Sequence, residues 1–275
     1  VYQIIILNWP LKEAFFMQKL TIDLDQNKKI FFASDFHLGA PNKEQSRSRE
    51  KKIIRWLETV EKDAAAILLV GDLFDFWFEY DHVVPKGFVR FLNKLAEFSD
   101  KGIPIYIFHG NHDMWMFDYL ETEIGATVFS DPIELKVNDK ILFVGHGDGL
   151  GPGDYTFKAL RKVFKNRMAQ WLFKWIHPDI GVGFASKWSS RSRINNTIES
   201  QEIDKEKEWL FLYSKKLESD RHFDFYVFGH RHLPLALEIN KTSTYINLGE
   251  WLNFNSFGVF DGTHFLIDYF ESDAN

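Results

Sequence analysis

Five short polar motifs occur in one order along this chain, and each follows directly on an apolar run. The motifs are Asp35-Phe36-His37, Gly71-Asp72-Leu73-Phe74-Asp75, Gly110-Asn111-His112-Asp113, Gly145-His146-Gly147-Asp148 and Gly229-His230-Arg231-His232. Runs such as Ile67-Leu68-Leu69-Val70 are typical of strands buried on both faces of a parallel sheet. Because open α/β sheets bind ligands at the carboxyl ends of their strands, we expect the motifs to meet at one such edge.

The polar side chains of these motifs form a set of metal ligands. They are carboxylates, an amide and imidazoles, namely Asp35, His37, Asp72, Asn111, His146, His230 and His232. Asp72 is the natural bridging ligand, because a carboxylate has two oxygens and can contact two ions. The two residues of Asp35-x-His37 are expected to leave a strand end on the same side, since side-chain direction repeats every two residues. Seven such ligands can hold two divalent metals side by side, an arrangement suited to breaking phosphate esters.

The ligand types also restrict the metal. The chain has no cysteine, so thiolate coordination is excluded. Oxygen ligands mixed with imidazole nitrogens suit manganese, and also iron or zinc, better than magnesium or calcium alone. Taken singly, each motif has an ordinary explanation, since Gly and Asn also favour turns. It is the ordered set, each member after a strand, that predicts a metal centre.

From Asp35 to His232 the motif set resembles the calcineurin-like metallophosphoesterase superfamily. The resemblance implies an α/β fold of the α+β sandwich type, with a β-sandwich flanked by helices. It assigns one metal to Asp35, His37, Asp72 and His232, and the other to Asp72, Asn111, His146 and His230. It also gives His112 a catalytic role beside the scissile phosphate, oriented by Asp75. An imidazole there would protonate the leaving oxygen or stabilise the developing charge.

Length and composition indicate one large domain. A chain of 275 residues can bury a full α/β core, and 45% hydrophobic residues exclude disorder. We expect this domain to cover residues 17–275. Residues 1–16 carry neither the basic start nor the cleavage site of a signal peptide, and Met17 precedes the first strand. They are predicted to be a non-native or peripheral extension.

Hydrophobic periodicity predicts the elements between the motifs. Helices are expected over residues 45–61, 84–98, 114–124 and 202–217. Strands are expected over residues 127–129, 133–137, 140–144, 244–248, 257–260 and 264–270. No stretch approaches the 18 apolar residues needed to cross a membrane.

The segment 155–193 differs in charge from the chain as a whole, whose net charge is −6. It contains nine Lys or Arg residues and a single acid, Asp179, mixed with aromatic residues such as Trp171 and Trp175. Basic and aromatic side chains on helices suit an anionic membrane surface. The alternative is a helical cap whose aromatic side chains pack on the body of the protein. Nucleic acid is not expected as a partner, because no nucleic-acid module accompanies the segment.

The residues around the motifs narrow the resemblance. Ala33 to Gly39, Gly71 to Trp77, His146 to Leu150 and the basic helical segment resemble the UDP-2,3-diacylglucosamine hydrolases of lipid A synthesis. That resemblance implies cleavage of a lipid-linked UDP-sugar to UMP and 2,3-diacylglucosamine 1-phosphate by a manganese enzyme. It implies that segment 155–193 is a lid for acyl chains and that the protein is peripheral on the cytoplasmic face of the inner membrane. Substrate contacts are expected from Asn111, Asp154, Tyr155, Arg191 and Arg193.

Two departures leave alternatives open. The best-known branch of that family has Arg at the position of His112, and the run Gly149 to Gly153 also differs. Arg is a fixed bidentate cation, whereas His can donate a proton. A phosphodiesterase or phosphatase acting on a soluble nucleotide or sugar nucleotide is therefore the second candidate. A non-catalytic scaffold is disfavoured, because all seven ligand positions are intact.

Overall fold

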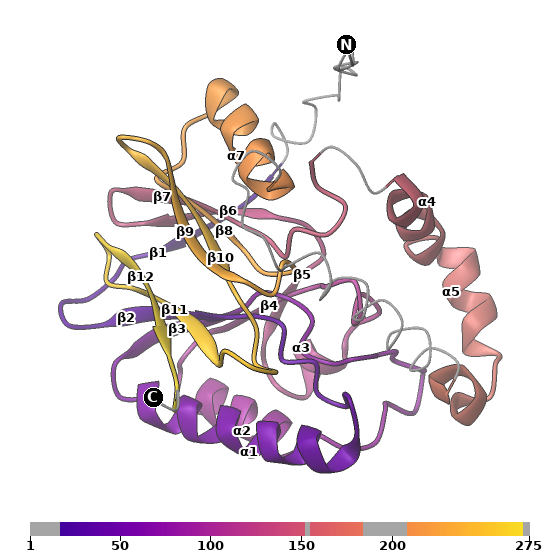
Figure 1. The fold of residues 1–275 in the computed structure, drawn as a ribbon. Helices are drawn as coiled ribbons and strands as arrows, with labels where there is room; N and C mark the ends of the chain where they lie inside the picture. The colour runs from indigo at the N-terminus through magenta and orange to yellow at the C-terminus, as the bar shows by residue number, and fades with distance from the viewer. Residues whose placement is uncertain (1–16, 152–154, 184–207, 272–275) are drawn as a thin grey trace.

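Two six-stranded mixed sheets lie face to face in the computed structural model, and helices cover their outer faces (Figure 1). The structure describes residues 17–151, 155–183 and 208–271, and of residues 155–157 the backbone alone. This is the helix-flanked β-sandwich that the sequence predicts, so the predicted fold class is confirmed.

The elements are as follows. Across the first sheet the strands are β1 (Gln18–Ile22), β6 (Ile133–Val137), β7 (Lys140–Val144), β8 (Phe225–Phe228), β10 (Ser243–Leu248) and β9 (Pro234–Asn240). Across the second they are β12 (Phe265–Tyr269), β11 (Ser256–Phe260), β2 (Lys29–Ala33), β3 (Ala64–Leu69), β4 (Ile105–Phe108) and β5 (Thr127–Phe129). The helices are α1 (Lys43–Val60), α2 (Val89–Asp100), α3 (Tyr119–Thr122), α4 (Tyr155–Phe164), α5 (Arg167–Lys174) and α7 (Trp209–Asp220), and residues 178–183 are also helical.

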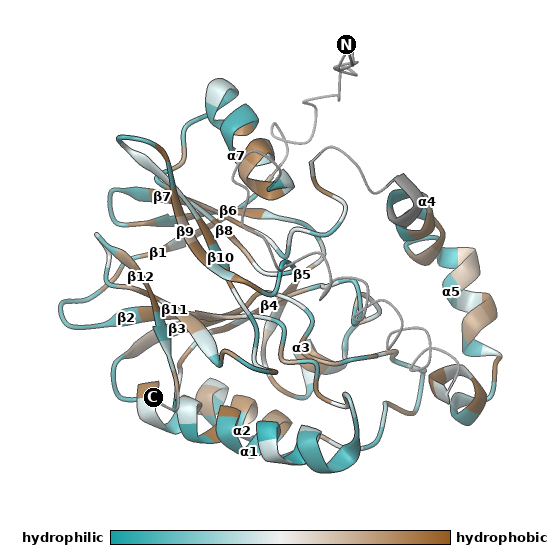
Figure 2. Ribbon diagram, in the orientation of Figure 1, coloured by the Kyte–Doolittle hydropathy of each residue, from teal (hydrophilic) through white to brown (hydrophobic). Residues whose placement is uncertain are grey.

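Side-chain alternation along the strands builds the layers. In β2, Ile30 and Phe32 pack between the two sheets, whereas Phe31 and Ala33 pack with side chains of α1 and α2. Because such strands are buried on both faces, their sequences are continuous apolar runs. Helix α7 covers the first sheet through a third apolar cluster. In Figure 2, α1 alternates hydrophilic and hydrophobic residues, as expected of a helix with one buried face.

The parallel strands bring the motifs together. Strands β2, β3, β4 and β5 pair in parallel, and so do β7 and β8. The five motif loops follow β2, β3, β4, β7 and β8, so their polar residues gather at the carboxyl ends of these strands. This placement is the one that strand polarity predicts.

Local structure differs from the predictions where side chains occupy backbone groups. Strands β5, β6 and β7 have the predicted bounds. The helix predicted over 114–124 is only the short α3, because the Glu79 carboxylate accepts the N–H groups of Phe117, Asp118 and Tyr119. Helix α2 begins at Val89 and not at residue 84, since Phe88 adopts a left-handed conformation (φ 57°). The sequence analysis missed β1 and β9.

The basic segment forms α4, α5 and the helical residues 178–183, beside the sandwich (Figure 1). Two aromatic side chains, Phe164 and Phe173, pack on Trp115 of the sandwich at ring-centroid distances of 5.1 and 5.0 Å. In the part of the chain that the structure describes, no helix has the length and apolar character that a membrane crossing requires. Residues 1–16, on which the prediction of an extension rests, lie outside that part.

Candidate metal centre

Side chains from all five motif loops lie together in two groups that share one residue. Asp35, His37, Asp72 and His232 have donor atoms within 4.8 Å of one another, and so do Asp72, His146 and His230. Asn111 joins the second group, because its Oδ1 lies 2.9 Å from His230 Nδ1 and 3.2 Å from His146 Nε2. All seven side chains predicted as ligands are therefore brought together, with Asp72 common to both groups. Their assignment as ligands stays a prediction.

The backbone reaches this arrangement by leaving the strand conformation. The residues Asp35, His37, Asp72, His230 and His232 all have positive φ, between 43° and 66°. Left-handed conformations are costly for residues with a side chain and tend to concentrate at functional sites. The strand alternation expected for Asp35-x-His37 was therefore the wrong reason for their proximity. The loop geometry, and not the strand period, turns both side chains toward the centre.

Two glycines allow the loops to approach one another. A Cβ on Gly110 would lie 2.1 Å from Asp72 Oδ1, and one on Gly229 would lie 2.6 Å from Asp35 Oδ2. Any larger residue at either position would displace a carboxylate of the centre. The motif glycines are thus required by packing between loops, which the sequence shows only as a repeated Gly before a polar residue.

The loop that carries His37 is held from behind by Arg49 of α1. Its buried guanidinium donates to the carbonyl oxygens of Phe36, His37 and Ala40, each at 2.6 Å. Planar Arg groups are suited to such convergent acceptors. The sequence analysis missed Arg49, because nothing in a helical pattern marks one Arg as buried.

Asp113 was also missed, although it belongs to a motif. Its buried carboxylate accepts N–H groups of Gly110, Asp72, Leu73 and Phe74 at 2.7–3.3 Å, and so joins the loops after β3 and β4. Burial, together with the charge of Asp72, raises the pKa of Asp113 to about 7. The final Asp of the Gly-Asn-His-Asp motif was the signal that could have identified it.

His112 lies at the centre outside these two groups, and it forms a third cluster of possible ligand atoms with His37 and Asp75. Its Nε2 is 4.0 Å from Asp72 Oδ2, and its ring is perpendicular to that of His37 at 4.9 Å. Asp75 contacts it chiefly through the backbone, because the Asp75 carbonyl lies 3.2 Å from His112 Nδ1 and the carboxylate 3.9 Å. The same carboxylate is 3.8 Å from His37 Nδ1. Asp75 thus stands between the two imidazoles.

The electrostatics of the cluster favour a cation. Burial alone would raise the pKa of Asp35, but the charge of the neighbouring His232 holds it well below its usual value. Burial lowers the pKa of His37 to about 3, which leaves the neutral imidazole that metals bind. Burial acts to lower the pKa of His146, yet the charge of Asp72 raises it well above its usual value. Ionised carboxylates thus stabilise positive charge within the cluster.

A buried oxygen tests whether metal ions fit here. Asp35 Oδ1 is buried and has no hydrogen-bond partner among the described residues. Asp35 Oδ1 lies 3.0 Å from His232 Nε2 and 3.6 Å from His37 Nε2, so three potential ligand atoms face one another. Buried polar atoms are normally satisfied. A divalent cation would satisfy the converging atoms, so the donor set fits the pair of ions.

Most residues predicted to contact the substrate lie outside the part of the chain that the structure describes. Asp154, Arg191 and Arg193, and the side chain of Tyr155, lie outside the described residues, while Asn111 stands in the second group. Asp154, Tyr155, Arg191 and Arg193 stay predictions.

Comparison with known proteins agrees with this geometry. Residues 28–234 match the model of the family described as calcineurin-like phosphoesterase. The UDP-2,3-diacylglucosamine hydrolase of Porphyromonas gingivalis is 38% identical, over 88% of this chain and 98% of that protein. The protein of the same name from Histophilus somni is 26% identical, over 82% and 92%. The structure of Vps29 from Entamoeba histolytica with zinc has 12% identity and a TM-score of 0.43, covering 90% and 94%.

These matches confirm both resemblances that the motifs predicted. The family model covers all five motif loops as far as residue 234, and the bacterial relatives extend over most of the chain. The chain belongs to the calcineurin-like phosphoesterase family, and it is a metal-dependent hydrolase with a centre for two divalent ions.

Proposed function

We propose that this protein hydrolyses the pyrophosphate bond of UDP-2,3-diacylglucosamine and releases UMP and 2,3-diacylglucosamine 1-phosphate. The observation that carries the proposal is an exposed apolar stripe on a helix that packs on the loops after β3 and β4, which also carry Asp72 and Asn111 of the metal centre. A substrate with a pyrophosphate and two acyl chains needs both features. The relatives named as UDP-2,3-diacylglucosamine hydrolases support the same substrate.

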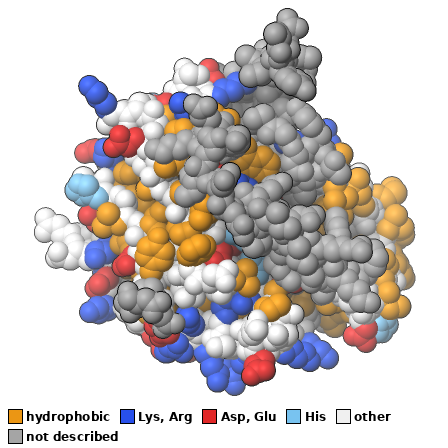
Figure 3. Space-filling view, in the orientation of Figure 1, with side chains coloured by type: hydrophobic (Ala, Val, Ile, Leu, Met, Phe, Trp, Pro, Cys, Tyr) orange, Lys and Arg blue, Asp and Glu red, His pale blue; other side chains and the backbone are white. Residues whose placement is uncertain are grey.

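The stripe lies on α5 and continues past its end. Met168, Trp171, Leu172 and Trp175 follow the helical spacing i, i+3, i+4 and i+7, and their exposed fractions are 69%, 55%, 56% and 75%. Figure 3 shows hydrophobic side chains along the edge of the molecule that α4 and α5 occupy. The alternative of a helical cap packed on the protein therefore accounts for Phe164 and Phe173, which pack on Trp115. It does not account for the exposed apolar side chains of α5. Large exposed apolar patches mark sites for lipid or partner binding.

We assign residues 155–193 to a lid that receives the acyl chains and contacts an anionic membrane surface. Exposed Trp with neighbouring Lys and Arg is the composition that interfacial helices use. This would place the protein at the cytoplasmic face of the inner membrane as a peripheral protein. For the ions we propose manganese, since the donors are carboxylates, an amide and imidazoles.

The residues of the centre divide the chemistry. Two bound ions would supply positive charge for the phosphate oxygens and would lower the pKa of the attacking water. Asp72 is proposed to join the two ligand groups, and Asn111 to face both the second ion and the substrate. His112 is proposed as the group that donates to the leaving oxygen, with Asp75 holding its ring. These roles need His112 free of metal. His112 belongs to neither of the two groups that contain Asp72, and it lies with His37 and Asp75 in a third cluster of possible ligand atoms.

We expect His112→Gln to lower kcat by about 10²–10⁴-fold while the protein keeps its metal. Glutamine keeps a polar side chain of similar reach but cannot deliver a proton. Metal content by mass spectrometry and turnover of the lipid substrate are the two measurements. A parallel loss of metal and activity would show instead that His112 is a ligand.

The proposed function is tested by product identification. Manganese-loaded protein is incubated with UDP-2,3-diacylglucosamine in neutral detergent, and the products are identified by mass spectrometry. UMP together with the acylated sugar 1-phosphate is the expected result. Cleavage of a small phosphodiester without turnover of the lipid would reject the lipid substrate and favour a soluble nucleotide or sugar nucleotide.

The acyl-chain role of the stripe gives a further prediction. Replacing both Trp171 and Trp175 with Ser is expected to raise KM for the lipid substrate by about tenfold or more, because each loses a large apolar contact. Hydrolysis of bis(p-nitrophenyl) phosphate should stay within about twofold, since both side chains are exposed and belong to none of the apolar core clusters of the described residues. Phe173→Ser is the contrasting variant, because Phe173 packs on Phe78 and Trp115. Equal losses on both substrates in the Trp variant would reject the role of the stripe.

A further inference from the structure

The loop after His146 has little conformational preference of its own. Gly147, Gly149 and Gly151 all have positive φ, at 111°, 69° and 73°. Glycine populates such conformations without steric cost but also loses the most freedom on folding. A loop with three of them in five residues must therefore be fixed by its neighbours. This loop leads from a proposed ligand to the segment that forms α4.

Helix α4 supplies those neighbours through one face. Lys158 and Arg161 of α4, and Lys165 directly after its last residue, have the spacing i, i+3 and i+7, which places them on the same side of a helical turn. Arg161 Nε lies 2.9 Å from Asp148 Oδ2, and Lys158 Nζ donates to the carbonyl oxygen of Gly151. A Cβ on Gly149 would lie 3.3 Å from Arg161 Cδ, so the Arg161 stem packs directly on the loop backbone.

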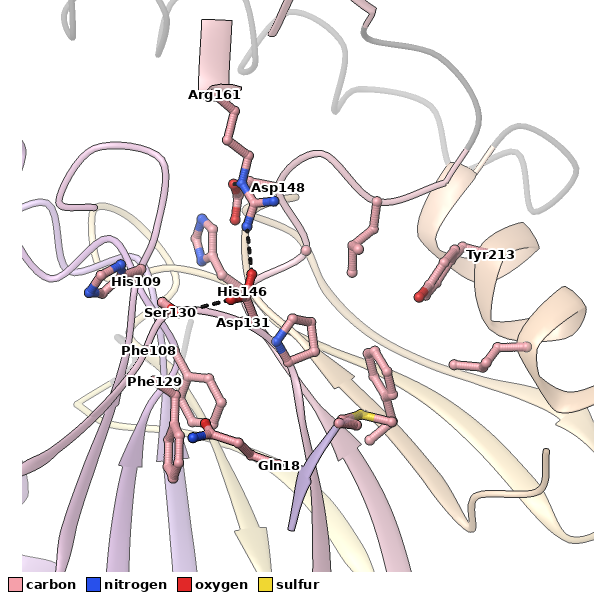
Figure 4. Close-up of a pocket in the computed structure, with 16 residues that line it drawn as sticks. Gln18, Phe108, His109, Phe129, Ser130, Asp131, His146, Asp148, Arg161 and Tyr213 are labelled. Atoms are coloured by element: carbon pink, nitrogen blue, oxygen red, sulfur yellow. Dashed lines mark hydrogen bonds and ion pairs between the residues drawn. The ribbon is translucent and has the colours of Figure 1, made fainter. Parts of the chain in front are cut away.

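A second contact extends the same face to the loop after β5. Lys165 Nζ lies 2.7 Å from Asp131 Oδ1, and Arg161 Nη2 lies 3.6 Å from the same atom. Figure 4 shows Arg161 reaching down from α4 toward Asp148 and Asp131, above a cavity of about 480 Å³. Asp131 is 62% exposed, whereas the Asp148 side chain is 7% exposed. Asp148 is thus the buried carboxylate of the two, and removal of Arg161 leaves its charge without this neighbouring cation.

We propose that Arg161 and Asp148 are positioning residues that seat α4 on the loop after His146, and so determine how tightly the acylated substrate binds. Helices α4 and α5 are joined by only two residues, so the seating of α4 determines where the apolar stripe of α5 lies relative to the metal centre. The pair acts through the helix, and neither residue belongs to the groups of possible metal ligands. The effect on substrate binding rests on the proposed function, whereas the contact between α4 and the loop does not.

Two readouts test the proposal in the full-length protein. In neutral detergent, Arg161→Met and Asp148→Asn are each expected to raise KM for UDP-2,3-diacylglucosamine by about tenfold, with kcat within about twofold. The double variant should be no worse than either single variant, because both remove one interaction. Arg161→Lys keeps the charge and should restore part of the lost affinity. Hydrolysis of bis(p-nitrophenyl) phosphate and metal content should stay unchanged.

Hydrogen exchange tests the packing of α4 on the loop after His146 without using any substrate. Amide exchange in residues 155–165 is expected to accelerate in Arg161→Met but not in Lys162→Met, which removes an exposed cation from the neighbouring position. If wild-type protein does not cleave the lipid, the proposed function fails while the exchange result still decides the seating. Identical exchange and KM values in the two variants would overturn the proposal. An equal loss on lipid and small diester, with metal loss, would also overturn it.

Discussion

Replacing Asp72 with Asn is expected to lower hydrolysis by at least about 10³-fold and to reduce the metal content below two ions per chain. Asp72 is the one carboxylate common to both ligand groups. Its Oδ2 lies 3.4 Å from His146 Nε2 and 3.7 Å from His37 Nε2, so a single side chain faces both halves of the centre. Asparagine keeps the shape but loses the negative charge that two adjacent cations require.

The comparison of Asn with Ala at this position separates charge from structure. Asp72 Oδ1 accepts the N–H of His112 at 2.9 Å, so Asp72→Ala also releases the loop after β4. Asn retains an oxygen that can accept the N–H of His112. In metal-free protein, the Asp72→Asn variant should therefore unfold at nearly the same denaturant concentration as wild type. Asp139→Asn, which changes an exposed carboxylate in the turn between β6 and β7, is the matched control and should leave activity and metal content unchanged. Wild-type activity in Asp72→Asn would refute the bridging role.

The sequence predicted which side chains meet, because strand polarity alone brings the ends of β2, β3, β4, β7 and β8 to one edge. It did not predict how they meet. The left-handed residues of the centre and the contacts of Arg49 depend on backbone carbonyls and N–H groups, which every residue has and which leave no pattern in the sequence. Asp75 illustrates the limit, since the contact within hydrogen-bond distance comes from its carbonyl.

Element bounds were predictable where periodicity decided them. Strands β6 and β7 are joined by a tight turn at Asn138 (φ 53°), and both had the predicted bounds. Helix α3 was shorter than predicted because Glu79, 40 residues earlier in sequence, takes the N–H group of Tyr119. A long-range side-chain acceptor competes with local helix formation, and no window of neighbouring residues contains that information.

Asp113→Ala is expected to have the largest effect on stability. The carboxylate is fully buried and accepts four backbone N–H groups, those of Gly110, Asp72, Leu73 and Phe74. Alanine would leave these donors buried without a partner, at about 1–3 kcal/mol each and less than additively. We expect the free energy of unfolding to fall by about 3–5 kcal/mol, a large share of the total for a domain. Denaturant unfolding of metal-free protein measures it.

The unfolding measurements use metal-free protein because Asp113 binds backbone N–H groups of the loops and is not one of the proposed metal ligands. Asp113→Asn keeps one acceptor oxygen and should lose roughly half as much stability as the Ala variant. Asp139→Ala, in the exposed turn between β6 and β7, should stay within about 0.5 kcal/mol of wild type. If Asp113→Ala unfolds like Asp139→Ala, the loops after β3 and β4 are held by other contacts. If it unfolds early, the last residue of the Gly-Asn-His-Asp motif supports the fold on which Asp72 and Asn111 depend.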